Sequence, residues 1–424
     1  MLRFIYTLLL YLLTPLVLLR LLWRGKKAPA YRQRWSERFG FPPFRIDQPC
    51  IWFHTVSVGE TMAALPLIRA VMAQYPETPV LVTTTTPTGS QQVLSSFGDA
   101  VSHCYIPYDL PLAVAIFLRR INPRIFIVME TELWPNLFHA CRRGDVPVIV
   151  VNTRLSERSA ARYRRFAALT KETLTSVRCF AVQHQSDADR LLSLGAQTSA
   201  VKVTGNIKFD ITLSPDLSEQ AQFLRHDWGE SRPVWIAAST HEGEDEQILQ
   251  ALKQIRSVLP DILLVLVPRH PERFSKVVTM CCDHGYSVVR RSDGRPCDSA
   301  TGVFVGDSMG ELCLFYAAAD VAFVGGSLVA TGGHNVLEPA ALGKPVIFGP
   351  HMFNFSEAGR LLLENDAAKQ VDDSDQLAKV VINYLLDVSL RQSSGERAIR
   401  VIKENSGALH RTTMLIAELL NAKT

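Results

Sequence analysis

Short apolar runs alternate with helical patterns from Cys50 onward, and they fall into two sets. The first half of the chain contains CIWFHTV, VLVTTTT, IFIVME, VPVIVVN, CFAVQH and VKVTGN, and the second half contains VWIAAS, ILLVLVP, VFVGD, VAFVGG and PVIFG. Their apolar residues are continuous rather than alternating with polar ones, which is typical of strands buried on both faces. With helices between the runs, the pattern predicts two α/β domains, each built on a parallel sheet.

The boundary between these domains is expected near 212–232, a polar segment punctuated by Pro and Gly. We therefore divide the chain into a membrane anchor at 1–23, an N-terminal Rossmann-like domain at 24–212 and a C-terminal Rossmann-like domain at 213–424. The tail from about 375 to 422 has a helical pattern.

The N-terminal segment carries no charge from Phe4 to Leu19. Continued to Trp23, it reaches about 20 residues, the length that crosses a ~30 Å hydrocarbon core. No small-residue cleavage site follows, and 24–34 contains five basic residues. We predict an uncleaved signal-anchor, with the domains on the cytoplasmic side of the membrane. A cleaved signal peptide and a buried core helix are the alternatives, and the sequence leaves open whether the helix spans the bilayer.

Charge and cysteine content narrow the functional classes. Residues 1–34 hold seven basic and no acidic residues, whereas the remaining chain carries 38 basic and 41 acidic residues. This body lacks the basic excess of a nucleic-acid-binding protein, so we expect no nucleic-acid partner. The eight cysteines show no metal-ligand spacing, which indicates reduced thiols in a reducing compartment.

Three residues of the first half lie just after apolar runs, where open α/β sheets bind their ligands. Glu60 opens an apolar helix, either as an acid that interacts with the helix dipole or as a general base. Glu130 directly follows IFIVM, where a carboxylate is costly unless it is paired or belongs to a site. Lys208 follows a Gly-Asn turn and either binds a substrate anion or is plain surface.

A set of arginines follows the run VIVV. Arg154, Arg158, Arg162 and Arg165 have the spacing of one helical face. They form either a solvated basic helix or a cradle for anionic groups, because the guanidinium fork matches phosphate.

The second half carries three loops with the features of a nucleotide pocket. They contain Pro268 and Arg269, then Met309, Gly310 and Glu311, then Asn335, Val336, Leu337 and Glu338. Small residues ahead of a helix offer backbone N–H groups to an anion. Asn335 is expected to be a helix N-cap, and Glu338 either binds a ribose diol or merely caps the helix. The chain has no GxGxxG, Walker A, HExxH or GxSxG motif.

Seven ordered stretches carry a resemblance to a known family. They are HTVSVGE (54–60), METELWPN (129–136), NTRLSERSAARY (152–163), TGNIKFD (204–210), PRHPERF (268–274), GDSMGEL (306–312) and GGHNVLEPAALGKPVIFGP (332–350). Over essentially its whole length, the sequence resembles the 3-deoxy-D-manno-octulosonic acid (Kdo) transferases of lipopolysaccharide biosynthesis.

The resemblance implies a GT-B fold, with two Rossmann-like domains facing a cleft. It implies a metal-independent, cofactor-free and inverting transfer of Kdo from CMP-Kdo onto the lipid A precursor (lipid IVA). Glu60 is then the catalytic base, and Glu130 and Lys208 stabilise the transition state. CMP is held by Pro268, Arg269, Met309, Gly310, Glu311, Asn335, Val336, Leu337 and Glu338. A nucleotide-sugar epimerase of the same fold and a non-catalytic, membrane-tethered nucleotide-sugar binder are the competing interpretations.

Overall fold

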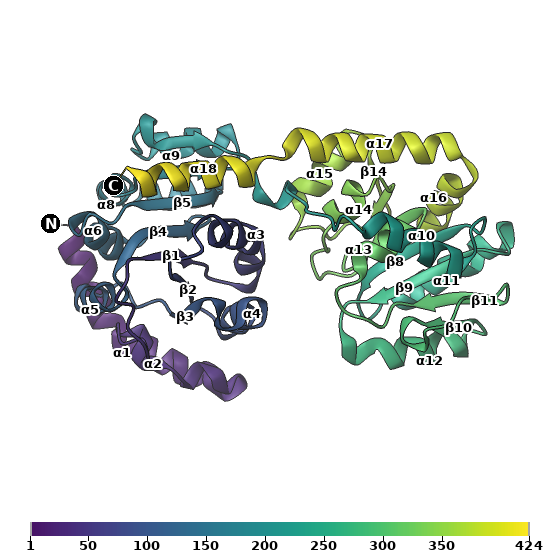
Figure 1. The fold of residues 1–424 in the computed structure, drawn as a ribbon, viewed down its shortest axis with the longest axis horizontal. Helices are drawn as coiled ribbons and strands as arrows, with labels where there is room; N and C mark the ends of the chain where they lie inside the picture. The colour runs from purple at the N-terminus through teal and green to yellow at the C-terminus, as the bar shows by residue number, and fades with distance from the viewer. Residues whose placement is uncertain (1, 423–424) are drawn as a thin grey trace. The chain divides into compact units, whose positions relative to one another are not determined.

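Each set of apolar runs forms its own seven-stranded sheet in the computed structural model, which describes residues 2–422 (Figure 1). The chain divides into two compact units. Unit 1 combines the residues up to Asp210 with those from Ser406 onward, and unit 2 comprises Ile211–Asn405. The prediction of two α/β domains built on parallel sheets is therefore confirmed, whereas a cleft between them stays a prediction.

Unit 1 contains the strands β1 (Cys50–His54), β2 (Val80–Thr84), β3 (Ser102–Tyr105), β4 (Pro123–Met129), β5 (Val148–Thr153), β6 (Cys179–Val182) and β7 (Val201–Val203). Its α-helices are α1 (Leu2–Lys27), α2 (Trp35–Arg38), α3 (Val58–Gln74), α4 (Pro87–Phe97), α5 (Pro111–Ile121), α6 (Pro135–Arg143), α7 (Glu157–Arg164), α8 (Ala167–Leu174), α9 (Gln185–Ser193) and α18 (Ala408–Asn421). Unit 1 also contains the short 3₁₀ helices η1 (Pro29–Arg32) and η4 (Ile207–Phe209).

Successive residues of the central strands fill two cores, one on each face of the sheet. On β1, Trp52 enters the core that contains the apolar residues of α5, α6, α8 and α9. Its neighbours Ile51 and Phe53 enter the opposite core, with residues of α3 and α18. Because both faces are covered, the central strands need apolar residues at every position, which is the continuous pattern seen in the sequence.

The strand order of unit 1 is β3-β2-β1-β4-β5-β6-β7, so the direction of winding reverses between β1 and β4. Unit 2 has the order β10-β11-β9-β8-β12-β13-β14 and reverses between β8 and β12. At such a reversal, the crevice beyond the carboxyl ends of the two strands is a ligand-binding position. Each unit thus has one switch point at which to look for chemistry.

Unit 2 contains the strands β8 (Val234–Thr240), β9 (Leu263–Pro268), β10 (Ser287–Arg290), β11 (Thr301–Val305), β12 (Val321–Val324), β13 (Val346–Phe348) and β14 (Ala368–Gln370). Its α-helices are α10 (Leu217–Trp228), α11 (Asp245–Val258), α12 (Phe274–Asp283), α13 (Leu312–Ala318), α14 (Leu337–Ala341), α15 (Ser356–Glu364), α16 (Ser374–Leu386) and α17 (Val388–Asn405).

Three strands and one helix were not predicted. The strands β3, β10 and β14 all lie at sheet edges, where SHCY, SVVR and AKQ lack a long apolar run. The predicted joint at 212–232 contains α10, whose residues Leu217, Ala221, Leu224 and Trp228 are buried at helical spacing. The division between the units falls instead after Asp210.

The C-terminal boundary differs from the prediction that residues 213–424 form one domain. The helical tail is confirmed as α16, α17 and α18, but α18 returns to unit 1. Ala408, Ile416 and Leu420 of α18 enter the core beside α3. Asp210 fixes the start of this helix, because its carboxylate accepts the N–H groups of Gly407 (2.5 Å) and Leu409 (2.6 Å).

The N-terminal apolar segment is the continuous helix α1, which Pro15 does not interrupt. An 18-residue stretch within Leu2–Lys26 has a mean hydropathy of 2.0, so the helix is long and apolar enough to cross a membrane, although length and composition alone do not separate an anchor from a signal sequence. The predicted apolar helix is confirmed, and it suggests membrane anchoring.

We expect Asp210→Ala to lower the free energy of unfolding of unit 1 by about 0.5–2 kcal/mol, because two N–H groups at the start of α18 lose their acceptor. The matched control is Asp216→Ala, because Asp216 precedes α10 without a side-chain capping bond. Urea unfolding of the full chain measures both variants. An equal loss in both would contradict this role of Asp210.

Candidate active site

The switch point of unit 1 brings Glu60 and Glu130 to the same edge of the sheet. Glu60 lies in the first turn of α3, which follows β1, and Glu130 directly follows β4. Ser57 caps α3 by accepting the N–H of Glu60 (3.4 Å). In return, the Glu60 carboxylate accepts the N–H of Val56 (2.8 Å) and the hydroxyl of Ser57 (3.3 Å). Glu60 is therefore a capping residue and is also held at the crevice, so the two interpretations of this acid are compatible.

The surroundings of Glu60 make its carboxylate unusually basic. Burial raises the pKa of Glu60 to about 7, and the negative charges of Glu130 and Glu132 act in the same direction. The hydrogen bond from Val56 opposes this rise. Burial and the charge of Glu130 also raise the pKa of Glu132. A carboxylate with a pKa near the operating pH is well suited to take up a proton as a general base.

Glu130 adopts a left-handed backbone conformation with φ of 56°. Such a conformation costs a non-glycine residue about 1–3 kcal/mol, so it persists only where surrounding contacts impose it. Here the N–H of Glu130 donates to the carbonyl of Val151 (2.9 Å), and the hydroxyl of Thr131 donates to the carbonyl of Arg154. The end of β4 is thus tied to the end of β5 and the loop after it.

Lys208 is placed at the same edge through Asn152, which follows Val151 at the end of β5. The buried Asn152 side chain accepts the N–H of Ile207 through Oδ1 (3.1 Å). Asn206 in turn accepts the N–H of Lys208 (3.1 Å), so the short helix η4 is fixed beside β5. The structure therefore gathers the loops of all three predicted catalytic residues at one edge of the sheet, although the role of each is untested.

The prediction of four arginines on one helical face is wrong in part. Helix α7 covers only Glu157–Arg164, so Arg158 and Arg162 lie on it, one turn apart. Arg154 precedes the N-cap Ser156, and Arg165 follows the last residue of the helix. The early end of α7 explains the difference, because the chain turns at Arg165 and Phe166 before α8 begins. All four side chains are exposed.

In unit 2, Arg269 and Glu338 share one neighbourhood. Pro268 ends β9, and the N–H of Arg269 donates to the carbonyl of Thr240 (3.1 Å), which leaves the exposed side chain of Arg269 beyond the sheet. Burial raises the pKa of Glu338, whereas a hydrogen bond from Asn335 and the charge of Arg269 oppose this rise. A cation and a partly buried carboxylate thus lie together at the carboxyl edge.

The loop before α14 differs by one residue from the prediction. The N-cap is Val336 rather than Asn335, because α14 begins at Leu337. The Asn335 side chain still accepts the N–H of Leu337 (3.0 Å), and its amide group donates to Glu338 (2.9 Å). Asn335 therefore orients the Glu338 carboxylate.

The loop of Met309, Gly310 and Glu311 is held by its acidic member. Glu311 accepts two hydrogen bonds from Arg291 (2.8 and 3.1 Å) and one from Ser308 (2.5 Å). The bond from Arg291 lowers the pKa of Glu311. Met309 and Gly310 are exposed, and Gly310 has φ of +87°. In this arrangement the backbone of Met309 and Gly310 is accessible to a ligand, while the Glu311 side chain positions the loop.

Glu244 is a buried carboxylate at the switch point of unit 2 that the sequence interpretation did not single out. It is 0% exposed and lies at the start of α11, just after β8. Its oxygens accept the N–H groups of His241 (3.0 Å), Gly326 (2.6 Å), Ser327 (2.9 Å) and Leu328 (2.9 Å). Glu244 thereby fixes the loop that follows β12.

Three histidines near Glu244 were also missed. The Nε2 atoms of His241 and His334 are 2.8 Å apart in parallel rings, and the His270 ring lies 5.3 Å from His241. Burial, together with the neighbouring histidines and Arg269, lowers the pKa of His334 to about 4. These residues follow β8, β9 and β12, which are neighbours in the sheet. Knowledge of the strand order would therefore have predicted that the three histidines lie together.

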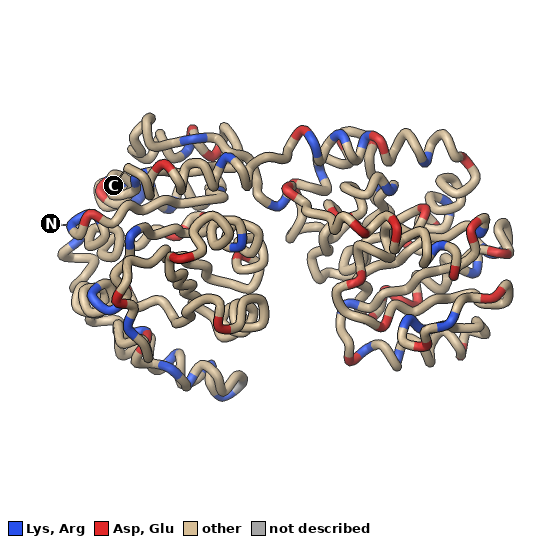
Figure 2. The backbone as a smooth tube through the Cα atoms, viewed as in Figure 1, with Lys and Arg blue, Asp and Glu red and all other residues tan. Residues whose placement is uncertain are grey.

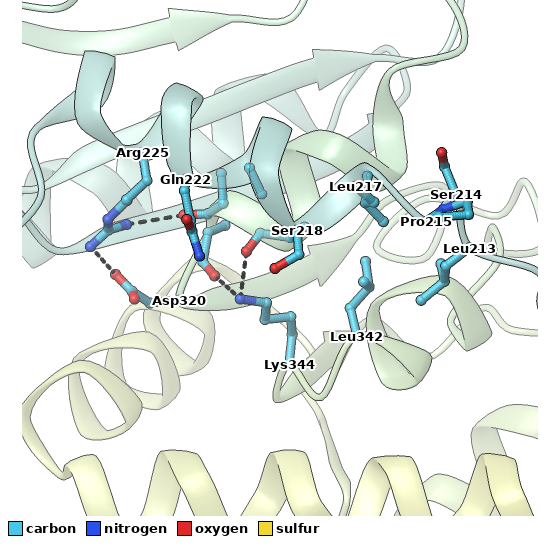
Figure 3. Close-up of a pocket in the computed structure, with 14 residues that line it drawn as sticks. Leu213, Ser214, Pro215, Leu217, Ser218, Gln222, Arg225, Asp320, Leu342 and Lys344 are labelled. Atoms are coloured by element: carbon cyan, nitrogen blue, oxygen red, sulfur yellow. Dashed lines mark hydrogen bonds and ion pairs between the residues drawn. The ribbon is translucent and has the colours of Figure 1, made fainter.

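A cavity of about 490 Å³ in unit 2 lies away from these loops, at the amino ends of β12 and β13 (Figure 3). There the Lys344 ammonium donates to the carbonyls of Ala317 (2.8 Å) and Ala319 (2.7 Å). Arg225 donates to the carbonyl of Ala318 (3.1 Å) and to Asp320 (3.1 Å). These side chains satisfy the last carbonyls of α13. We therefore interpret the polar groups that line this cavity as helix caps rather than as ligand-binding groups.

Comparison with known proteins identifies the family. The family model described as "3-Deoxy-D-manno-octulosonic-acid transferase (kdotransferase)" matches residues 33–211. The chain is 42% identical to the 3-deoxy-D-manno-octulosonic acid transferase of Haemophilus influenzae, with 99% of each chain covered. It is 37% identical to the transferase of the same name from Bordetella pertussis, with 97% of each covered.

Solved structures confirm the GT-B fold. The UDP-GlcNAc 2-epimerase of Neisseria meningitidis matches with a TM-score of 0.55 and 14% identity, covering 88% of this chain and 99% of that one. A glycosyltransferase from Rickettsia africae matches with a TM-score of 0.54 and 12% identity over the same shares. The fold is common to epimerases and transferases, so the function follows from the closer relatives. The chain belongs to the family of Kdo transferases, the glycosyltransferases that introduce Kdo in lipopolysaccharide biosynthesis.

Proposed function

We propose that this enzyme transfers Kdo from CMP-Kdo onto the lipid A precursor (lipid IVA), with inversion and without a metal ion, and that Glu60 is the general base. The observation that carries the proposal is the Glu60 carboxylate at the β1/β4 switch point, where burial raises its pKa to about 7. Such a carboxylate is partly ionised at neutral pH and still basic enough to accept a proton during the reaction.

The chemistry requires a base because a sugar hydroxyl is a poor nucleophile at neutral pH. As the acceptor oxygen bonds to the anomeric carbon of Kdo, the bond from that carbon to the phosphate oxygen of CMP breaks, and Glu60 takes the hydroxyl proton. Attack opposite the departing phosphate inverts the anomeric centre. General-base assistance of this kind contributes about 10²–10⁴-fold.

Glu130 and Lys208 are assigned to the stabilisation of developing charge. Loss of the phosphate leaves positive charge on the sugar ring, which the Glu130 carboxylate stabilises. The same negative charge keeps Glu60 basic. The positive charge of Lys208 offsets the negative charge of the donor's anionic groups as they move apart.

The donor is assigned to unit 2. Arg269 faces the single phosphate of CMP, because a guanidinium binds phosphate through charge-assisted hydrogen bonds. The oriented carboxylate of Glu338 accepts the ribose hydroxyls, and the backbone of Met309 and Gly310 meets the remainder of the nucleotide. Pro268, Glu311, Asn335, Val336 and Leu337 hold these groups in place.

The acceptor is a lipid that carries phosphates, which fits an enzyme on the cytoplasmic side of the inner membrane. Helix α1 has no acidic residue, and basic residues follow its apolar part. Positive charge beside an apolar segment favours the cytoplasmic side. The exposed Arg158 and Arg162 on α7 then serve the phosphates of the acceptor head group.

We expect Glu60→Gln to lower kcat by about 10²–10⁴-fold, because an amide cannot accept the proton. In the wild type, kcat/KM should fall about tenfold per pH unit below about pH 7 as Glu60 becomes protonated, and the variant should lose this limb. Mass spectrometry of the lipid product measures the rate. The control is Glu157→Gln, which changes another first-turn acid, that of α7. Wild-type activity in Glu60→Gln would refute the general base.

Glu60→Gln should also raise the free energy of unfolding at pH 8, by about 1–3 kcal/mol. The folded-state pKa is raised from 4.5 to about 7, so ionisation of Glu60 weakens the fold as the pH rises through this window. The range allows for the partial exposure of Glu60. The gain should disappear below about pH 4.5, which urea unfolding at several pH values would detect. If Glu60 acted only through the helix dipole, Glu60→Gln would instead lower the free energy of unfolding by about 0.3–1 kcal/mol.

We expect Arg269→Gln to raise the KM for CMP-Kdo by about 10–100-fold, the equivalent of the 1.5–3 kcal/mol that a hydrogen bond to a charged group contributes. The KM for the acceptor should stay within a factor of about two, since the loss concerns donor binding alone. The matched control is Lys276→Gln, which removes an exposed cation that is paired with Glu242 in the same unit. Similar increases in both KM values would place Arg269 outside the donor site.

A further inference from the structure

One face of α1 is partly covered by α6 and α8 of unit 1 and by η1, the short helix that directly follows it. The residues that are wholly or partly covered recur every three or four positions: Arg3, Tyr6, Thr7, Leu10, Thr14, Val17, Leu18, Leu21 and Gly25. This spacing defines a single stripe on an α-helix. In Figure 1, α1 starts near α6 and runs along the flank of unit 1 past α5, and its residues contact α6, α8 and η1.

Polar side chains fasten the N-terminal half of this stripe. The Tyr6 hydroxyl donates to Asp109 Oδ2 (3.0 Å), and the Thr7 hydroxyl lies 3.0–3.1 Å from both side-chain atoms of the Asn136 amide. Asp109 is 4% exposed and also accepts the N–H groups of Asn136 (3.0 Å) and Leu137 (2.7 Å). Helix α1 is thus bonded to a buried carboxylate that itself caps the first turn of α6.

This contact lies at the catalytic edge of unit 1. Asp109 follows β3, and Asn136 lies in the first turn of α6, the helix that follows β4 and the loop containing Glu130. Both positions belong to the carboxyl edge of the sheet, where Glu60 also lies. The anchor helix is therefore attached to the part of unit 1 that carries the predicted base.

The opposite face of α1 is apolar and exposed. Phe4, Leu12 and Trp23 are 65–73% exposed, and Leu8, Leu16 and Leu19 are 50–60% exposed. An apolar surface of this extent on a protein normally has a partner. Figure 2 marks basic residues toward the C-terminal end of α1, which carries no acidic residue. An apolar face with adjoining positive charge complements a membrane surface that contains anionic phospholipid.

The docking contacts are incompatible with a helix that crosses the bilayer. At 1.5 Å per residue, Thr7 lies about 20 Å along the helix from Arg20. If Arg20 stayed at the head groups of a spanning helix, Thr7 would lie deep in the hydrocarbon. Asn136 and Asp109 would have to follow it there, together with the polar surface of α6, and burying such groups in lipid is prohibitively costly.

We propose that α1 is an in-plane anchor: it lies along one leaflet with its apolar face in the membrane, stays docked on α6 and α8, and does not cross the bilayer. The proposal rests on the membrane location proposed above and adds the orientation of the helix. It also gives the docking contact a purpose, because a helix bonded to the carboxyl edge holds the Glu60 loop at a fixed height above the leaflet that contains the lipid acceptor.

Crosslinking in native membranes tests the docking directly. The full-length variant Thr7→Cys with Asn136→Cys is treated with a two-carbon bis-methanethiosulfonate, and the linked peptides are quantified by mass spectrometry, so that native cysteines need not be removed. The matched control is Leu8→Cys with Asn136→Cys, which moves the thiol to the exposed face. We expect about tenfold more linkage in the first pair, because successive helical residues point about 100° apart. Equal or absent linkage in both pairs would overturn the proposal.

A second measurement does not depend on these substitutions. An epitope at the N-terminus should resist protease added to spheroplasts and should be cleaved in inverted membrane vesicles, as an epitope at the C-terminus is. A spanning helix would give the reverse result for the N-terminal epitope, since the positive charge after α1 would keep the other end outside. That result would overturn the in-plane anchor alone, whereas recovery of the whole protein in the soluble fraction would overturn the membrane location itself.

Discussion

The reversal of strand order in each parallel sheet is the constraint on which the functional loops depend. At β1/β4 and at β8/β12, the helices that follow the two strands leave toward opposite faces of the sheet, so the space beyond the strand ends is left open. Glu60 and Glu130 follow the first pair of strands, and Glu244 and His334 follow the second. The same topology therefore creates one candidate binding edge in each unit before any particular side chain is considered.

Buried carboxylates then organise the loops at these edges, and their partners set what each can do. Glu244 accepts four backbone N–H groups and Asp109 accepts two together with the Tyr6 hydroxyl, so both are committed to holding a loop or a helix. Glu60 accepts only one backbone N–H and faces the charges of Glu130 and Glu132. Burial and the nearby like charges raise the pKa of Glu60 to about 7, and its carboxylate accepts fewer backbone N–H groups than that of Glu244 or Asp109, which fits the proposed role as general base.

The sequence predicted those parts of the molecule that depend on local burial. Central strands such as IFIVM are covered on both faces and show continuous apolar runs, and the residues directly behind them, Glu130 and Arg269, could be found from strand ends alone. Edge strands such as AKQ are half-exposed and lack this signal. Glu244 and His241 were missed because their importance depends on which strands become neighbours. The return of α18 to unit 1 likewise depends on Asp210 and on packing between residues far apart in the sequence.

Helix α1 likewise shows what hydropathy averaged along the chain does not reveal. A mean hydropathy of 2.0 over 18 residues describes α1 as a potential span, because averaging ignores the face on which each residue lies. Tyr6 and Thr7 add little to that average, yet both point toward Asp109 and Asn136. In a spanning helix these polar groups would need partners within the membrane, whereas on unit 1 they already have them. In the in-plane arrangement proposed above, a few polar side chains, rather than the overall apolarity, orient this helix at the bilayer and hold the predicted catalytic edge beside it.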